Sequence, residues 1–342
     1  MKNSALITGS VLAQLYLFGL GFAQATERPE FSLPVGCDEG QPCLLQNLVD
    51  MDTSNIRLDA LCGRSTYNGH KGTDFRVVNI PQMEKGVPVL AMADGVVVGL
   101  RNSQPDILVE TAKHKIAVRG KECGNGLILD HGKFGGKRWT SQYCHLKQGS
   151  VNFKKGAQIK RGQAIGEIGL SGHTMFPHVH ITVRAGKTLY DPLTGITVQP
   201  NKPQCSAKDA DPLFTAEAMA KIKAGDSPLM EAGFADRAVK DKDIMKGAFS
   251  QPRPRRPMVF YAYFKNLLKG DKIRLVIKSG SNVWMKSTTE PLKVDKSSYT
   301  VFAGRRKGGK KKRTYHGTAE IIRGDKVVFT SEPVSLSFKG SL

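Results

Sequence analysis

Two histidines separated by one residue, His178 and His180, have the spacing in this sequence that most clearly suggests chemistry. They lie in the run F-P-H-V-H-I-T-V, whose β-branched residues favour an extended strand. Residues two apart in a strand point to the same face, with backbones ~7 Å apart. One imidazole could therefore bind a metal ion while the other acts on whatever the ion holds, which predicts a catalytic metal rather than a stored one.

A second motif could complete the metal site, because a hydrolytic zinc ion needs three protein ligands and one open position for water. His70 and Asp74 stand four residues apart in G-H-K-G-T-D-F. In a flat strand their backbones would lie ~13 Å apart, but Gly72 between them permits the chain to bend. Histidine with a carboxylate suits zinc, and manganese or iron would also be compatible.

A third cluster is the run Q-Y-C-H-L that ends at Leu146. In a strand, Tyr143 and His145 would share one face, leaving His145 free for catalysis. Cys144 would then point to the back of the sheet, where we expect it to form a disulfide. The other histidines are interpreted as structural: His114, His131 (expected in a turn), His173 and His316.

The elements that must position these motifs are predicted to be β-strands. Residues 61 to 205 alternate short apolar runs with glycine turns, at 87–90, 95–98, 126–129 and 162–166. Many short strands separated by Gly and Asp indicate an antiparallel β domain, and no amphipathic pattern of helical length interrupts it. We expect residues 61–205 to form one antiparallel β domain.

The rest of the chain is divided by composition. Residues 206–257 are predicted to be a connector, helical near 216–222 and ending in a linker rich in Pro and Arg. Residues 258–342 predict a small C-terminal β-sandwich of immunoglobulin-like type, with a binding or spacer role. Its expected strands are 259–264, 272–278, 299–302, 317–322 and 326–329.

The N-terminus predicts export. Residues 1–25 combine Lys2, an apolar stretch and the small-x-small site A-Q-A, which is typical of a secretory signal peptide. No later segment is apolar and long enough to cross a bilayer, so no transmembrane segment is expected in the mature chain. Residues 26–60 are expected to be an N-terminal segment that disulfides join to the next domain.

The chain has six cysteines, an even number that predicts disulfides in an oxidising compartment. None forms a C-x-x-C pair. Cys37 and Cys43 suggest a local loop, and Cys123 and Cys144 bracket a strand–turn–strand unit. Pairing these leaves a third bridge, between Cys62 and Cys205, which would join the two ends of the β domain at 61–205.

The formal net charge is +21. In an exported protein, this charge favours an anionic polymer of the cell envelope over nucleic acid as the partner. The densest run lies on a glycine-containing loop, expected at a hairpin tip, where a solvated loop and an anion-binding patch are equally compatible with the sequence. Its cations are Arg305, Arg306, Lys307, Lys310, Lys311, Lys312 and Arg313.

Taken in order, these motifs resemble the lysostaphin-like zinc metallopeptidases. The resemblance covers residues 62–185 and includes G-H-K-G-T-D-F, G-N-G-L-I-L-D-H-G, Y-C-H-L, G-Q-A-I-G and P-H-V-H. It implies a β fold with a groove, one zinc ion per chain and cleavage of peptide crosslinks in bacterial peptidoglycan. Carried over, the zinc ligands are His70, Asp74 and His180, and the catalytic pair is His145 and His178. Either member of the pair could be the general base.

The leading hypothesis is an exported zinc endopeptidase that cleaves D-alanyl–diaminopimelate crosslinks in the periplasm of a Gram-negative bacterium. A second hypothesis is a non-catalytic envelope protein that binds peptidoglycan, or regulates an amidase, through the same groove. A third is a basic polyanion-binding protein with an incidental metal site. A metal assay combined with release of uncrosslinked muropeptides from sacculi discriminates the first two.

Overall fold

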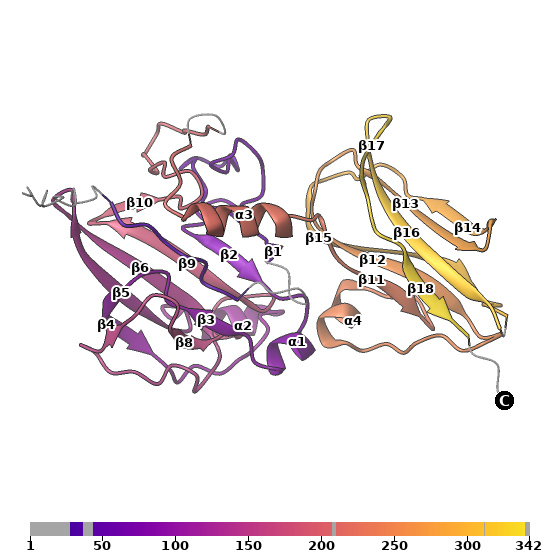
Figure 1. Cartoon of the computed structure of the whole chain (residues 1–342), viewed down its shortest axis with the longest axis horizontal. Coiled ribbons are helices and arrows are strands. Elements are labelled where there is room, and N and C mark those ends of the chain that lie inside the picture. The colour runs from indigo at the N-terminus through magenta and orange to yellow at the C-terminus, as the bar shows by residue number, and fades with distance from the viewer. Residues whose placement is uncertain (1–27, 37–43, 207–209, 311, 339–342) are drawn as a thin grey trace, which may run out of the picture.

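The computed structural model describes residues 28–36, 44–206, 210–310 and 312–338. As Figure 1 shows, one large sheet lies in the purple and pink half of the chain, and further sheets lie in the orange and yellow half. Every strand pair is antiparallel, which confirms the expectation of a mostly β, antiparallel chain. The predicted signal peptide, Cys37 and Cys43 lie outside the described residues.

An eight-stranded sheet carries the predicted chemistry. Its order is β1-β2-β9-β6-β5-β4-β7, and β10 pairs with the end of β9 on the edge that β2 also uses. Its strands are β1 (Leu44–Leu45), β2 (Thr73–Arg76), β4 (Gly95–Arg101), β5 (Asn125–Phe134), β6 (Lys137–Leu146), β7 (Gln158–Ile159), β9 (His178–Ala185) and β10 (Thr188–Tyr190). A separate pair is formed by β3 (Pro88–Leu90) and β8 (Ala164–Glu167).

The two faces of β9 divide its side chains by type. Val179, Ile181 and Val183 belong to the main hydrophobic core and are fully buried. Because side chains alternate along a strand, His178 and His180 face the opposite side. The register places His180 beside Asp74 of β2 and beside Cys144 of β6. Strand pairing therefore brings the three predicted motifs next to one another.

Two short helices interrupt the region in which no helix was expected. They are α1 (Ile80–Glu84), whose first turn is capped by the side chain of Asn79, and α2 (Ala112–Ala117), capped by Thr111. Five or six residues make less than two turns, so neither helix leaves an amphipathic period in the sequence. His131 lies not in a turn but within β5, at an irregularity in its pairing with β6.

The C-terminal strands form two sheets on one shared core, which includes Phe260, Phe264, Ile273 and Leu275. One sheet has the order β11-β12-β15; the other has the order β14-β13-β16-β17, with β18 paired to β16. The strands are β11 (Leu229–Ala235), β12 (Met258–Leu267), β13 (Lys272–Ser279), β14 (Asn282–Thr288), β15 (Lys296–Arg305), β16 (Thr314–Arg323), β17 (Lys326–Thr330) and β18 (Val334–Ser337).

The expected connector contains more structure than its composition suggests. The predicted helix is α3 (Ala216–Gly225), and a second helix, α4 (Asp241–Lys246), follows β11. Because β11 pairs with β12, the C-terminal sheets begin before residue 258. The division into domains and the immunoglobulin-like assignment remain predictions.

The basic run does not form a hairpin tip. β15 pairs with β12 in one sheet, whereas β16 pairs with β13 in the other, so the residues between them cross from sheet to sheet. Gly309 fits closely against the rings of Phe338 and Tyr315, which anchors the middle of this crossing.

The Cys62–Cys205 disulfide joins two residues 143 positions apart, confirming the expected bridge between the ends of the peptidase region. Within the described part of the chain, no helix is long and apolar enough to span a membrane.

Candidate metal centre

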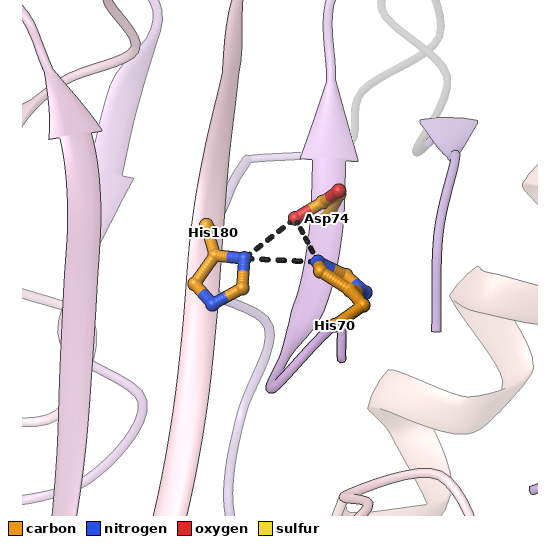
Figure 2. A group of neighbouring side chains, drawn as sticks. All are labelled: His70, Asp74 and His180. Atoms are coloured by element: carbon orange, nitrogen blue, oxygen red, sulfur yellow. Dashed lines mark hydrogen bonds and ion pairs between the residues drawn. The ribbon is translucent and has the colours of Figure 1, made fainter. Parts of the chain in front are cut away.

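His70, Asp74 and His180 converge on one point. The Oδ1 atom of Asp74 lies 3.1 Å from Nε2 of His70 and 2.9 Å from Nδ1 of His180, and the two nitrogens are 3.0 Å apart. Figure 2 shows His180 and Asp74 on adjacent strands, with the ring of His70 closing the triangle. All three side chains are largely buried. Among the described residues, this is the group of His, Cys, Asp and Glu that could hold a metal ion.

The bend expected at Gly72 is present, and close packing explains the glycine. His70 precedes β2, so the chain turns before Asp74 enters the strand. A Cβ atom on Gly72 would lie 2.3 Å from the carbonyl oxygen of Ile181 and 2.5 Å from Nε2 of His180. A side chain at this position would therefore push β9 and its histidine away from β2.

Three further groups, which sequence reasoning missed, orient the donors. The carbonyl oxygen of Leu48 lies 2.7 Å from Nδ1 of His70, Nδ2 of Asn47 donates to Oδ2 of Asp74 at 2.8 Å, and Oγ1 of Thr182 lies 3.0 Å from Nε2 of His180. Of these three groups, only Thr182 could be found from the sequence, since it continues the alternation H-x-H-x-T on one face of the strand. Partners of this kind fix which ring nitrogen is available to a metal.

The charges in this cluster favour an ionised carboxylate. Burial would raise the pKa of Asp74, but the charges of His70 and His178 and hydrogen bonds from His180 and His70 hold it well below its usual value. Burial would lower the pKa of His70, but the charge of Asp74 and its hydrogen bond raise it. An anion therefore sits between two imidazoles, as a cation site requires.

The donor set fits zinc. Two imidazole nitrogens and one carboxylate oxygen are a three-ligand set found in catalytic zinc sites. Ligand atoms ~2.1 Å from a tetrahedral ion lie about 3.4 Å from one another, so the present separations of 2.9 to 3.1 Å require only a small opening. The outer nitrogen of His70 donates to the carbonyl of Leu48, and that of His180 lies within hydrogen-bond distance of the Thr182 hydroxyl, so each inner nitrogen can give up its proton to coordinate an ion.

His145 and His178 form a second pair beside this triangle. Their ring centroids are 4.6 Å apart, and Nε2 of His178 lies 3.5 Å from Oδ1 of Asp74. Nδ1 of His145 is 2.8 Å from the carbonyl oxygen of Ser171, and Nδ1 of His178 is 2.9 Å from that of Phe176. Each Nδ1 therefore carries a proton, and each Nε2 keeps its lone pair.

His145 reaches the site by a different route from the one expected. Tyr143 is buried in the core, and Cys144, paired with His180, lies on the same face as the metal donors, so its placement on the back of the sheet was wrong. A left-handed backbone at His145, with φ of 65°, turns its side chain to that face as well. Its N–H donates to the carbonyl of Cys123 at 2.8 Å, which helps to hold this rare conformation.

The expected Cys123–Cys144 disulfide is present and lies beside His145. Opposite it, the pairing of β5 with β6 is irregular at Gly126. A Cβ atom there would lie 1.8 Å from the carbonyl oxygen of Tyr143, so only glycine fits. Irregular pairing of this type re-aims side chains next to functional sites.

Burial keeps both histidines of the pair uncharged. It lowers the pKa of His145 well below its usual value, with help from the charges of His178 and His180. It also lowers the pKa of His178 to about 4, against the opposing charge of Asp74. A neutral imidazole can accept a proton, which is the property a general base needs.

The other histidines lie outside this cluster. His131 bonds to the carbonyl of Asp94 and to Ser141, the backbone of His173 donates to Glu122, and His316 contacts Ser335. His114 lies in α2. These local partners fit the structural interpretation.

The profile of peptidase family M23 matches residues 68–192. Peptidoglycan DD-endopeptidase ShyA of Vibrio cholerae serotype O1 is 34% identical over 111 residues, which cover 32% of this chain and 19% of that protein. Cell division protein DipM of Caulobacter vibrioides is 30% identical over 125 residues, which cover 36% and 17%. The chain thus spans about a fifth of the length of these curated relatives. Residues 68–192 are a peptidase family M23 domain, as the resemblance implied.

Solved structures of similar proteins include the catalytic domain of lysostaphin from Staphylococcus simulans. It is 26% identical, covers 39% of this chain and 80% of its own, and has a TM-score of 0.26. A zinc-containing peptidase from Vibrio cholerae is 24% identical, covers 47% and 39%, and has a TM-score of 0.32.

Proposed function

We propose that this protein is a zinc-dependent endopeptidase that hydrolyses peptide crosslinks of bacterial peptidoglycan. One observation carries the proposal: three converging metal donors lie beside two uncharged histidines within the family M23 region. A metal site for storage or structure would not need two further imidazoles with free nitrogens. The similarity to a peptidoglycan DD-endopeptidase supports peptidoglycan as the substrate.

In this proposal, His70, Asp74 and His180 hold the zinc ion. Zinc in such a site supplies Lewis acidity and lowers the pKa of water. Nε2 of His178, only 3.5 Å from Asp74, and Nε2 of His145 lie where a proton can be accepted from the nucleophile and passed to the leaving amine. The carbonyls of Phe176 and Ser171 stabilise each ring when it becomes positively charged.

The compartment is proposed from the same features. Two disulfides in the described residues favour an oxidising environment, and the relative from Vibrio cholerae is named for action on peptidoglycan, a polymer of the cell envelope. We propose export to the periplasm of a Gram-negative bacterium, with D-alanyl–diaminopimelate bonds as the crosslinks cleaved.

The test is digestion of defined crosslinked muropeptides by the full-length protein, with and without a zinc chelator. We expect conversion of the crosslinked dimer to monomers, loss of that activity with chelator and its return with added zinc. Binding to sacculi without any release of monomers would contradict the proposal and favour a non-catalytic envelope role.

We also propose that the basic crossing between β15 and β16 binds an anionic envelope polymer. Its described cations are exposed, and none makes an ion pair with another described residue. Binding of an anionic polysaccharide should weaken steeply with salt. Replacing Lys310, Lys312 and Arg313 with Gln should weaken it further, whereas equal binding by the triple variant would contradict this role.

A further inference from the structure

A buried arginine, Arg76, lies next to the catalytic pair without a carboxylate partner. Its residue is 3% exposed, and no described acidic group forms an ion pair with it. Burying an unpaired charge is costly unless every donor is satisfied. The proposed chemistry does not use this guanidinium directly, so its retention needs another explanation.

Five acceptors surround the guanidinium, which matches its five N–H donors. Arg76 donates to Oε1 of Gln46 at 2.8 Å and to the carbonyl oxygens of Val77 and Val78, both at 3.2 Å. The other two acceptors are the hydroxyls of Tyr263 on β12, at 3.5 Å, and Ser298 on β15, at 3.4 Å. The C-terminal sheets therefore complete a cage that the peptidase region only begins.

From this cage, contacts lead directly to His178. The register pairs Arg76 of β2 with His178 of β9. The guanidinium carbon lies 4.5 Å from the ring centroid of Phe176, and that ring lies 4.5 Å from the ring of His178. Phe176 also accepts the Nδ1 proton of His178 through its carbonyl. Arg76 thus supports the residue that orients His178 by stacking and by hydrogen bonding.

We propose that Arg76 is a positioning residue for His178, and that Tyr263 and Ser298 of the C-terminal sheets hold it in place. This gives the C-terminal sheets a part in hydrolysis beyond binding or spacing. The inference rests on the proposed endopeptidase function for its kinetic test. The orientation of the His178 ring can also be measured without substrate.

The test compares the full-length protein with the double variant Tyr263→Phe, Ser298→Ala, which removes two acceptors and leaves Arg76 in place. We expect kcat on a crosslinked muropeptide to fall about tenfold, because small displacements of reacting groups are costly. KM and zinc content should stay unchanged. The kcat of Arg76→Met should be lower still. The kcat of Arg76→Lys should lie between that of Arg76→Met and that of the wild type, since a cation again stacks against Phe176.

The matched control is Arg57→Gln, which removes an ion pair to Asp295 across the same boundary but does not touch Arg76. An equal loss of kcat in this control would show that loosening the boundary is sufficient, and would overturn the proposal.

NMR of the His178 Nδ1 proton gives a readout without activity. We expect slow exchange in the wild type and fast exchange in the double variant. An unchanged proton together with an unchanged kcat would also overturn the positioning role. Absence of any wild-type hydrolysis would instead remove the endopeptidase proposal, and the NMR measurement would still decide the role of Arg76.

A second, independent feature lies on the face of the large sheet that carries the metal donors. A cavity of about 180 Å³ adjoins the Cys123–Cys144 disulfide and is lined by Arg101, Gln142 and Ile128, among others. Cys123 lines the cavity, and its carbonyl oxygen accepts from the backbone N–H of His145 at 2.8 Å. Register relations place Arg101 opposite Gly126 and Ile128 opposite Gln142, so all of these share the face that holds the metal donors.

Arg101 lines this cavity, and Arg184 bonds to the lining residue Gln142; neither forms an ion pair with a described acid. Arg101 donates to the carbonyl of Gly124 at 3.2 Å, and Arg184 donates to Oε1 of Gln142 at 3.2 Å. Arg184 is half-buried. Glu122, whose pKa is lowered by backbone hydrogen bonds and more weakly by the charges of His173 and Arg101, is exposed. The cavity thus offers cationic hydrogen-bond donors on the same sheet face as the candidate metal site.

We infer that this cavity is a carboxylate subsite, in which Arg101 and Arg184 bind an acidic group of the stem peptide next to the cleaved bond. Arginine forks match carboxylates in geometry and charge. The inference rests on the proposed function and adds a substrate feature to it: a free rather than an amidated carboxyl on the crosslinking diamino acid.

The test uses crosslinked muropeptides that differ only in amidation of that carboxyl. The wild type should have about tenfold lower KM for the free acid, and Arg101→Gln with Arg184→Gln should abolish this preference with kcat unchanged. Lys155→Gln, an exposed charge elsewhere, is the control. Equal KM for both substrates in the wild type would overturn the subsite.

Calorimetric titration with the uncrosslinked peptide, as free acid and as amide, gives the same comparison without turnover. A wild type that cleaves neither substrate would remove the endopeptidase proposal, while the titration would still support or overturn the subsite.

Discussion

The eight-stranded sheet and the C-terminal sheets are both antiparallel, but they bury their strands differently. In β13 and β16, buried residues alternate with more exposed ones, as expected when one face packs on a core. In β2, all four residues are buried, and in β9 six of eight are. The second face of β2 and β9 is covered by the metal donors, by the histidine pair and, at Arg76, by Tyr263.

This difference in burial shows which kind of sheet face can carry chemistry. A face that is both polar and buried keeps its side chains in one geometry and shifts their pKa values, whereas an exposed polar face does neither. The C-terminal core is nearly all apolar, and its contribution near the site comes from hydroxyls at its boundary.

The largest effect should follow from removing a metal donor. Asp74→Ala and His180→Ala should lose bound zinc and reduce hydrolysis more than about 1,000-fold, because two remaining ligands do not hold the ion. Measured metal content tests the loss of zinc, and muropeptide turnover tests the loss of hydrolysis. Normal zinc content in His70→Ala, Asp74→Ala and His180→Ala would contradict the ligand assignment.

Removing a member of the histidine pair should separate binding from catalysis. His145→Ala and His178→Ala should each keep zinc and lower kcat by about 100- to 10,000-fold, since general acid–base catalysis is lost. The same two assays distinguish this outcome from the previous one. Loss of zinc in either variant would mean that the histidine pair also helps to hold the metal ion.

A core substitution in the C-terminal sheets should act on stability instead. Phe260→Ala should lower the free energy of unfolding by about 3 to 5 kcal/mol, because Phe260 is fully buried between the sheets. Val328→Ala, at a residue 51% exposed, is the control and should change it by less than about 0.5 kcal/mol. Denaturant unfolding measures both.

Two buried aspartates extend the comparison to pH. Asp271, at the C-terminal sheets, pairs with Arg323, whereas Asp191 follows β10 and has one oxygen without a partner among the described residues. Burial raises the pKa of Asp191 to about 6, from about 3.9 unfolded. Folding therefore favours its protonated form, and this stability is present below pH ~3.9 and lost as pH rises through about 6.

Relative to Asp191→Asn, the wild type should lose about 2 kcal/mol of stability between pH 4 and pH 7. Denaturant unfolding of both proteins across this pH range measures the difference in their stability. The titrating groups that the two proteins share cancel in this difference. A difference that does not change with pH would contradict the raised pKa.

Much of the fold could be predicted because it depends on local pattern. Strand runs such as 126–129 and 259–264 lie within β5 and β12, and the helix near 216–222 is α3. Pairing partners could not be predicted, since a strand's neighbour depends on packing rather than on its own residues. For this reason the sequence predicts a connector where β11 lies, and a hairpin tip where the basic run crosses between the two C-terminal sheets.

The sequence by itself determined that His178 and His180 share one face, because alternation along a strand is a local property. It also determined the chemical types of the donors. Only the tertiary structure decided that the left-handed backbone of His145 brings it to that face. Only the tertiary structure brought Asn47 to Asp74 and the hydroxyls of Tyr263 and Ser298 to Arg76. These contacts join residues 27 to 222 positions apart, and no local pattern records such pairings.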